Sequence, residues 1–135
     1  MPGDRDPVTG VEELLASARS GLTRVTPAEA LVESRDGAVL VDIRPAEQRV
    51  RDGELPGAEV ISRNVLEWRL DPGCEHRMTD LARPGARVIV VCNEGYQSSL
   101  AAANLRRFGL DATDLIGGFQ AWIAEGLPVD RPAVG

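Results

Sequence analysis

Short apolar runs alternate with segments of helical pattern along most of this chain. The runs at residues 38–42 and 88–91 are almost wholly apolar, which is typical of strands covered on both faces of a parallel sheet. The segments around them carry helix-start signals, helix-stop signals and turn dipeptides such as Asp36-Gly37. Strands and helices in alternation favour the α/β class, with helices on both faces of a parallel sheet.

Local signals set the bounds of several predicted elements. Thr26-Pro27 has the form of an N-cap followed by proline at the first helical position, and Gly109 stands where a helix from Ser98 would end. The whole pattern predicts a parallel five-stranded sheet. The predicted strands are residues 22–25, 38–42, 59–61, 88–91 and 112–115, and the predicted helices are residues 11–20, 27–34, 45–51, 64–70, 98–108 and a last helix that contains residues 119–123.

The length of 135 residues suits one domain with a continuous core, and a hydrophobic content of 43% argues against disorder. Residues 1–10 are rich in Pro, Gly and Asp, which predicts a flexible N-terminal tail. We expect a single domain over residues 11–129 and a C-terminal tail over residues 130–135. Three large aromatic side chains of this domain, Trp68, Phe119 and Trp122, are expected to pack in the core and not to bind a ligand.

The chain is acidic, with a formal net charge of -6, and all 15 of its basic residues are arginine. This acidity argues against nucleic acid and anionic membranes as partners. The lack of lysine excludes a Schiff-base amine and the lysine of a phosphate-binding P-loop. No span of about 18 apolar residues is present, and the first residues lack the apolar core of a secretion signal. We therefore expect a cytoplasmic protein.

Cys92 is the residue best suited to covalent chemistry. It follows the predicted strand at residues 88–91 and opens a tight loop in which Gly95 permits unusual backbone angles. The next helix begins near Ser98, so its free N–H groups and those of the loop point towards the sulfur. Such a setting favours the thiolate, which is the nucleophilic form. The alternative, a small buried hydrophobe, accounts less well for the glycine and the helix start.

Four segments of the chain resemble, in their order and separation, the markers of single-domain rhodanese-like proteins. Together they cover roughly residues 22–129. The resemblance implies the rhodanese-like three-layer fold, in which a parallel five-stranded sheet lies between two layers of helices. The segments are Val41-Asp42-Ile43-Arg44, Gly53-Glu54-Leu55-Pro56-Gly57-Ala58, Cys92-Asn93-Glu94-Gly95-Tyr96-Gln97-Ser98 and Gly117-Gly118-Phe119-Gln120-Ala121-Trp122.

The resemblance also implies a sulfurtransferase that works by double displacement. Cys92 would take a sulfane sulfur from thiosulfate or a thiol persulfide and pass it, as a persulfide, to cyanide or a thiol. The loop amides would stabilise the developing charge, and no metal or organic cofactor is implied. The implied partners are these small molecules or a sulfur-relay protein. The implied catalytic residue is Cys92, and the implied active loop continues through Asn93, Glu94, Gly95, Tyr96, Gln97 and Ser98.

Loop length separates two chemistries within this family. Rhodanese-like sulfurtransferases have six residues in the active loop, as from Cys92 to Gln97 here, whereas the related cell-cycle phosphatases have a longer loop that ends in arginine. This loop contains no arginine to bind phosphoryl oxygens in a bidentate manner. Phosphatase activity is therefore a remote alternative.

Three positions depart from the common pattern of the family. Glu54 stands where many members have histidine, and Gln97 stands where many loops end in arginine. Glu94 adds a carboxylate inside the loop, which opposes a thiolate and repels a dianionic donor unless its side chain turns outward. These departures support a second hypothesis, a non-catalytic or partner-dependent binding or sulfur-carrier module. Turnover of a small-molecule donor separates the module from an enzyme.

Two arginines are candidates for donor binding. Arg63 follows the predicted strand at residues 59–61, a segment that lies beside the active-site mouth in rhodanese-like folds. Its alternative role is an ion pair with Glu67 at helical spacing. Arg44 stands beside Asp42 and is either a donor ligand or the partner of that carboxylate at the strand end.

The segment Cys74-Glu75-His76 has the look of a ligand set. Two candidate ligands at this spacing fall short of the three or four that zinc needs, so we predict no metal site. Cys74 is either a loop residue or a resolving thiol for an oxidised Cys92. Two cysteines 18 positions apart do not form a disulfide framework, which leaves Cys92 available as a thiol in a reducing compartment.

Overall fold

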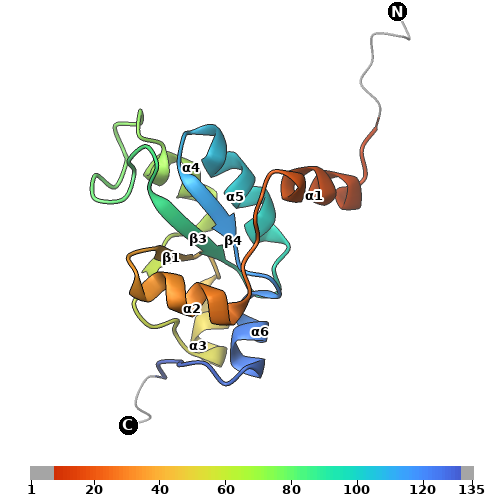
Figure 1. Ribbon diagram of the computed structural model, residues 1–135, viewed down its shortest axis with the longest axis vertical. Coiled ribbons are helices and arrows are strands. Elements are labelled where there is room, and N and C mark those ends of the chain that lie inside the picture. Colours follow the sequence, from red (N-terminus) through yellow and green to blue (C-terminus); the bar gives the residue numbers. More distant parts are fainter. Residues whose placement is uncertain (1–7, 132–135) are drawn as a thin grey trace, which may run out of the picture.

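The computed structural model describes residues 8–131, which form a parallel sheet with helices on both of its faces (Figure 1). The strands lie in the order β2-β1-β3-β4, and every neighbouring pair is parallel. This architecture confirms the predicted α/β class. The strands are β1 (Val39–Asp42), β2 (Glu59–Val60), β3 (Arg87–Val91) and β4 (Asp111–Asp114), and the helices are α1 (Val11–Ser20), α2 (Pro27–Arg35), α3 (Ala46–Asp52), the 3-10 helix η2 (Arg63–Val65), α4 (Leu66–Leu70), α5 (Gln97–Arg107) and α6 (Gly118–Ala124).

The predicted strand at residues 22–25 is reduced to a single bridge. Val25 pairs in parallel with Leu115, just beyond the end of β4, and its N–H donates to the Asp114 carbonyl at 3.2 Å. The next residue, Thr26, already caps α2, so the chain turns away before a longer ladder can form. The sheet of the described residues therefore has four strands and not the five expected.

The helix bounds lie close to those predicted. Thr26 and Glu29 form a capping box at the start of α2, with Pro27 at the first position, as the sequence indicates. The hydrogen bonds from Thr26 hold the pKa of Glu29 below its ordinary value. The segment predicted at residues 64–70 is divided into η2 and α4. Gly109 follows α5 with a φ of 92°, a backbone angle that glycine adopts readily.

β3 separates two apolar clusters, one on each face of the sheet. Val88 and Val90 belong to the cluster that α4 and α5 cover, whereas Ile89 and Val91 belong to the cluster that α2 and α6 cover. Alternate side chains of a strand point to opposite faces, so a wholly apolar strand requires cover on both. Burial of β3 on both faces fixes the position of the end of this strand, and therefore the position at which the following loop begins.

The aromatic residues divide between core and surface. Phe119 and Trp122 of α6 are buried, as predicted. The prediction for Trp68 is wrong, because this side chain is 57% exposed. Leu66 and Leu70 turn α4 towards the sheet, and Trp68 stands two positions from each, on the opposite side of the helix.

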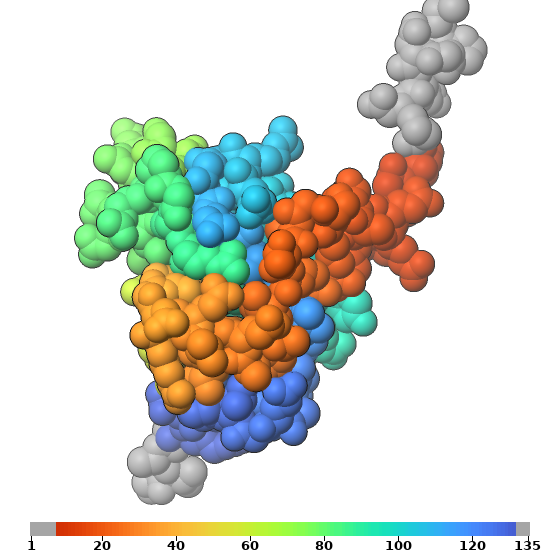
Figure 2. Space-filling view, in the orientation of Figure 1, coloured from red at the N-terminus to blue at the C-terminus, as the bar shows by residue number. Residues whose placement is uncertain are grey.

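Helix α1 packs along α5 and projects from the body of the molecule (red, Figure 2). No side chain of α1 is buried. Of the predicted N-terminal tail, residues 1–7 lie outside the described residues. Within residues 8–131, no helix is long and apolar enough to cross a membrane.

The end of the described chain is held against the domain. Asp130, the first residue of the predicted C-terminal tail, exchanges two backbone hydrogen bonds with Glu54, at 2.7 and 2.9 Å. This bridge connects the segment after α6 to the segment after α3. Residues 132–135 of the predicted tail lie outside the described part of the chain.

A buried ion pair ties the end of β1 to its surroundings. The Arg44 guanidinium donates to both carboxylate oxygens of Asp42, at 2.8 to 3.2 Å, and to the Gly53 carbonyl at 3.0 Å. Its central carbon lies 3.6 Å from the centre of the Phe119 ring. Both charged side chains have 0% exposure, so each depends on the other for compensation.

We expect Arg44→Ala to lower the free energy of unfolding by about 3 to 5 kcal/mol, because it leaves the Asp42 carboxylate buried without its partner. Urea titration followed by circular dichroism measures this loss. Arg51→Ala, which removes an arginine from an exposed pair with Asp52, is the matched control and should leave the unfolding midpoint unchanged. Equal midpoints for the two variants would contradict a stabilising role for the buried pair.

Candidate active site

Cys92 is the first residue after β3 and lies at the bottom of a pocket of about 360 Å³. The active loop, the segment that follows β1 and Arg63 of η2 line this pocket. Cys92 itself is only 7% exposed. The carboxyl ends of parallel strands β1 and β3 thus meet at the site, which is where open α/β sheets bind ligands.

Three groups surround the sulfur of Cys92 on the protein side. The N–H of Gly95 donates to Sγ at 3.1 Å, and the N–H of Ser98 donates to Sγ at 3.4 Å. The Ser98 hydroxyl oxygen lies 3.2 Å from the same sulfur. The loop and the first turn of α5 therefore point their backbone dipoles at the atom that would carry negative charge.

The other side of the loop is bonded to α6. The N–H of Phe119 donates to the Cys92 carbonyl at 2.8 Å, and the N–H of Gln120 donates to the Asn93 carbonyl at 3.1 Å. Gly118 permits this approach: a Cβ there would lie 2.6 Å from backbone atoms of both Cys92 and Asn93. The Gly117-Gly118 pair of the sequence pattern therefore serves close backbone contact with the active loop.

Gly95 is held by two arginines from the N-terminal part of the chain. Its carbonyl accepts hydrogen bonds from Arg19 of α1 at 2.7 Å and from Arg24 at 3.1 Å. Gly95 has a φ of 91°, and a Cβ there would lie 2.8 Å from the N atom of Gly117. Any other residue at this position would push the loop away from the sheet.

Asp114, at the end of β4, joins the arginines to the cysteine. Its carboxylate is fully buried and accepts from Arg24 at 2.9 and 3.2 Å, from the Ser98 hydroxyl at 2.8 Å and from the Ser99 hydroxyl at 2.7 Å. Asp114, Arg24 and Arg19 were not among the site residues expected from the sequence. One signal was available, since Asp114 is a charged residue inside a segment predicted to be a strand.

Arg63 forms the ion pair considered for it and also lies at the Cys92 pocket. Its Nη1 donates to both carboxylate oxygens of Glu67, at 2.8 and 3.0 Å, and the residue also lines the Cys92 pocket. Burial alone would raise the pKa of Glu67, but hydrogen bonds from Asn104 and Arg63 outweigh burial and hold that pKa below its ordinary value. Glu67 therefore stays ionised and compensates Arg63 at the pocket wall.

Glu94 and Glu54, the two carboxylates that depart from the family pattern, differ in their position relative to the pocket. Glu94 is exposed and lines the Cys92 pocket, and it forms no ion pair within residues 8–131. Glu54 is outside the lining and pairs with Arg49 at 2.9 Å. Of the two carboxylates, Glu94 therefore carries the uncompensated negative charge at the pocket mouth.

The other loop residues also line the pocket. Tyr96 is 59% exposed and lies beside the Arg19 guanidinium, whose central carbon is 5.8 Å from the ring centre. Gln97 is exposed at the start of α5. The side-chain oxygen of Asn93 accepts from the Gln120 amide at 2.9 Å. The mouth of the site is thus polar, with one aromatic ring.

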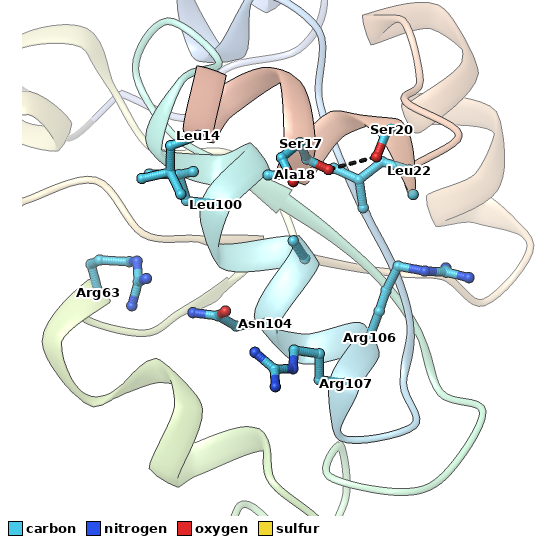
Figure 3. A pocket seen from close by; sticks show the side chains of 12 residues that line it. Leu14, Ser17, Ala18, Ser20, Leu22, Arg63, Leu100, Asn104, Arg106 and Arg107 are labelled. Carbon is cyan, nitrogen blue, oxygen red and sulfur yellow. Dashed lines mark hydrogen bonds between the residues drawn. The ribbon is translucent and has the colours of Figure 1, made fainter. Parts of the chain in front are cut away.

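Arg63 also borders a second hollow, a groove of about 550 Å³ between α1 and α5 (Figure 3). Leu14 and Leu100 line one end, and Asn104 and Arg107 line the other (Figure 3). A further hollow of about 740 Å³ lies on the other side of α1. α1 therefore has a hollow on each side. The hydrogen bonds from Arg19 to the Gly95 carbonyl and the Ser99 hydroxyl connect this helix to the active loop and to α5.

Cys74 and His76 lie away from this site. Cys74 lines a small separate hollow with Trp68 and Phe108, and the His76 ring faces Glu75 at 3.6 Å. The structure therefore does not bring Cys74 into the pocket of Cys92. In the part of the chain that the structure describes, no three His, Cys, Asp or Glu side chains gather in a way that could hold a metal ion.

The geometry defines a class of protein, namely a parallel α/β domain with a cysteine loop at the carboxyl end of an interior strand. Residues 26–125 match the family model of the Rhodanese-like domain. The chain therefore belongs to the rhodanese-like domain family, as the four sequence segments indicate. Arg19 and Arg24 precede the matched region.

Solved structures provide further comparisons. A protein of unknown function from Rhodopseudomonas palustris, described as a possible tyrosine phosphatase, is 29% identical, with 93% of this chain and 98% of that chain covered and a TM-score of 0.82. A rhodanese-related protein from Thermoplasma volcanium is 25% identical, with 78% and 95% covered and a TM-score of 0.62. The polysulfide-sulfur transferase homodimer of Wolinella succinogenes, 23% identical with 90% and 87% covered and a TM-score of 0.69, has the same fold. No curated protein matches the chain.

We expect Gly118→Ala to displace the active loop, because the added methyl group meets the backbone of Cys92 and Asn93 at 2.6 Å. The free energy of unfolding should fall by about 2 to 4 kcal/mol, and alkylation of Cys92 should slow. Gly57→Ala has a similar positive φ, with open space around it, and should cost about 1 kcal/mol through backbone strain alone. Similar losses in both variants would exclude a specific role for the contact.

Proposed function

We propose that this protein is a sulfurtransferase that carries a sulfane sulfur as a persulfide on Cys92. The observation that supports this most directly is the pair of N–H groups, from Gly95 and Ser98, that donate to Sγ at the bottom of an open pocket. Membership of the rhodanese-like domain family supports the same chemistry. The N–H pair would favour the thiolate and then the anionic persulfide.

The proposed reaction has two displacement steps and no net oxidation. In the first step, the Cys92 thiolate attacks the outer sulfur of thiosulfate; the sulfur–sulfur bond of the donor breaks, and its electron pair leaves with sulfite. In the second step, cyanide or a thiolate attacks the outer sulfur of the persulfide, and the electron pair returns to Cys92. A thiol persulfide would serve as donor in the same way, with a thiolate as the leaving group.

The charges around the pocket favour a donor with little negative charge. Arg63 and Arg44 contribute to the pocket lining, but Glu67 compensates Arg63, and the fully buried Arg44 guanidinium is paired with Asp42. Glu94 adds negative charge at the mouth. Thiosulfate carries two negative charges and would be repelled, whereas a thiol persulfide carries at most one on its sulfur. We therefore propose a thiol persulfide as the better donor, with Arg63 as the residue that contacts it.

The alternative to an enzyme is a sulfur-carrier module that depends on a partner protein. The exposed Tyr96 ring and the Glu94 carboxylate at the pocket mouth would suit contact with a sulfur-relay protein. In that case Cys92 would accept sulfur from its partner and scarcely from small molecules.

The description of the Rhodopseudomonas palustris protein raises phosphatase activity as a further candidate. This chain differs from what phosphoryl transfer requires, because its six-residue loop contains no arginine. The arginines behind the loop, Arg19 and Arg24, donate to the Gly95 carbonyl. Phosphatase activity therefore stays a remote alternative, which an assay with p-nitrophenyl phosphate tests.

Intact-mass spectrometry after incubation with thiosulfate, or with glutathione persulfide, tests the proposed function. The wild-type protein should gain about 32 Da, one sulfur atom, because the Cys92 thiolate takes the outer sulfur of the donor. Cys92→Ala should abolish the gain, and Cys74→Ala, which removes the cysteine outside the pocket, should retain it. No gain with either donor would contradict the enzyme and favour the partner-dependent carrier.

Glu94→Gln should raise kcat/KM for thiosulfate by about three- to tenfold at low ionic strength, because it removes the negative charge at the pocket mouth. The gain should shrink as salt is added and should be small for an uncharged donor. Glu75→Gln removes the same charge from a segment outside the pocket and is the matched control. An equal effect of both substitutions would show that overall charge, and not Glu94, limits the donor.

A further inference from the structure

Arg24 connects the N-terminal part of the chain to the site. It lies between α1 and the cap of α2, before the region that matches the family model. Its guanidinium donates to both carboxylate oxygens of Asp114 and to the Gly95 carbonyl. Asp114 lies at the end of β4, 90 positions away along the chain. The sequence and the family assignment do not by themselves suggest a role for this pair.

A buried carboxylate beside a nucleophilic cysteine is costly. Asp114 has 0% exposure, and its Oδ2 accepts from the hydroxyl of Ser98, which in turn lies 3.2 Å from the Cys92 sulfur. A negative charge at this short range opposes ionisation of the thiol. Arg24 provides the positive charge that offsets Asp114, so the two residues act on Cys92 with opposite signs.

The single proton of the Ser98 hydroxyl links the Arg24–Asp114 pair to the sulfur of Cys92. The Ser98 hydroxyl has one proton, and at 2.8 Å it donates this proton to Asp114. Its oxygen then accepts the S–H of Cys92 while the cysteine is a thiol. Once the sulfur is a thiolate, the serine proton has two anionic acceptors, the sulfur and Asp114. The more completely Arg24 and Ser99 satisfy Asp114, the more freely Ser98 turns its proton to the sulfur.

We propose that Arg24 and Asp114 form a positioning pair that sets the reactivity of Cys92 through the Ser98 hydroxyl. Asp114 orients Ser98 and Ser99. Arg24 offsets the charge of Asp114 and, through the Gly95 carbonyl, holds the residue whose own N–H faces the sulfur. The pair thereby deepens the proposed function, since it tunes the thiolate on which persulfide formation rests. The segment between α1 and α2, which contains Arg24, thereby contributes to the reactivity of Cys92.

Other charged groups lie around the site of Cys92, on the elements packed against it. Arg44 follows β1, Arg63 belongs to η2, Glu94 belongs to the loop and Arg19 projects from α1. Each of these stays unchanged when Arg24 or Asp114 is substituted. A shift in cysteine reactivity that differs in sign between the two substitutions would therefore report on the pair itself.

The test is the rate of Cys92 alkylation by iodoacetamide as a function of pH, in a Cys74→Ala background so that one thiol reacts. Iodoacetamide is uncharged, so substitutions do not steer it. Arg24→Gln leaves Asp114 without its counter-charge and should move the midpoint of the profile up by about one pH unit, which slows alkylation below the midpoint about tenfold. Asp114→Asn leaves Arg24 uncompensated and should move the midpoint down.

Two further variants complete the test. Adding Ser98→Ala to Arg24→Gln should reduce the shift, because the hydroxyl that carries the effect is gone. Arg87→Gln breaks an ion pair with Glu33 on another part of the domain and should leave the midpoint in place. Circular dichroism and thermal unfolding identify folded variants; if Asp114→Asn does not fold, Arg24→Gln with and without Ser98→Ala still decides the question.

The outcomes are distinct. Midpoints that move apart for the two substitutions support the positioning pair. Midpoints that move together, or that match the Arg87→Gln control, overturn it. Alkylation needs no sulfur donor, so a protein that fails to form a persulfide but shows the opposite shifts would refute the sulfurtransferase and leave the positioning pair standing.

Discussion

The orientation of the peptides in the active loop is the constraint on which the rest of the site depends. The carbonyl groups of Cys92 and Asn93 are bonded outward to α6, and the carbonyl of Gly95 is bonded outward to two arginines. These bonds fix the peptides on either side of the Glu94–Gly95 peptide, whose N–H donates to the sulfur. The second N–H comes from Ser98 in the first turn of α5. Such anchors outside the loop limit the backbone conformations that the loop can adopt.

The anchors come from three distant parts of the sequence. The first turn of α6 supplies N–H groups, β4 supplies Asp114, and the segment from α1 to α2 supplies Arg19 and Arg24. β3 is buried on both faces, and this burial fixes where the loop begins. The hydrophobic core therefore places the cysteine, and polar contacts from outside the core orient the peptides around it.

The sequence predicted the elements better than the contacts between them. Buried strands, the capping box at Thr26 and the glycine that ends α5 have local signatures, and each was found where expected. The ion pair of Arg63 with Glu67 could also be predicted from the sequence, because the two residues are four positions apart, the spacing at which side chains meet on a helix. Trp68 was misassigned since a short helix gives too few positions to define which side faces the sheet.

The residues of the site that the sequence did not reveal are those with non-local partners. Arg24 and Asp114 are 90 positions apart, and Arg19 and Gly95 are 76 positions apart. No periodicity relates such pairs; only the topology brings them together, after α1 has packed on α5 and Val25 has bridged to Leu115. The missing fifth strand has a related origin. In residues 22–25 the Arg24 side chain bonds to Asp114, the Thr23 carbonyl accepts from the Thr113 hydroxyl, and only Val25 forms a bridge to the sheet.

Charge balance explains what kind of anion the pocket suits. Four arginines lie at or behind it, and three of them have a carboxylate of their own: Arg44 has Asp42, Arg63 has Glu67 and Arg24 has Asp114. Arg19 instead donates to the Gly95 carbonyl and the Ser99 hydroxyl. The positive groups in direct contact with Sγ are the N–H dipoles of Gly95 and Ser98, which act at short range and in fixed directions. Dipoles of this kind stabilise one charge on the sulfur of Cys92 without drawing in anions from a distance. The two N–H contacts therefore act on the charge of the Cys92 sulfur itself, whereas the ion pairs around the pocket cancel most of the charge that an approaching anion would meet.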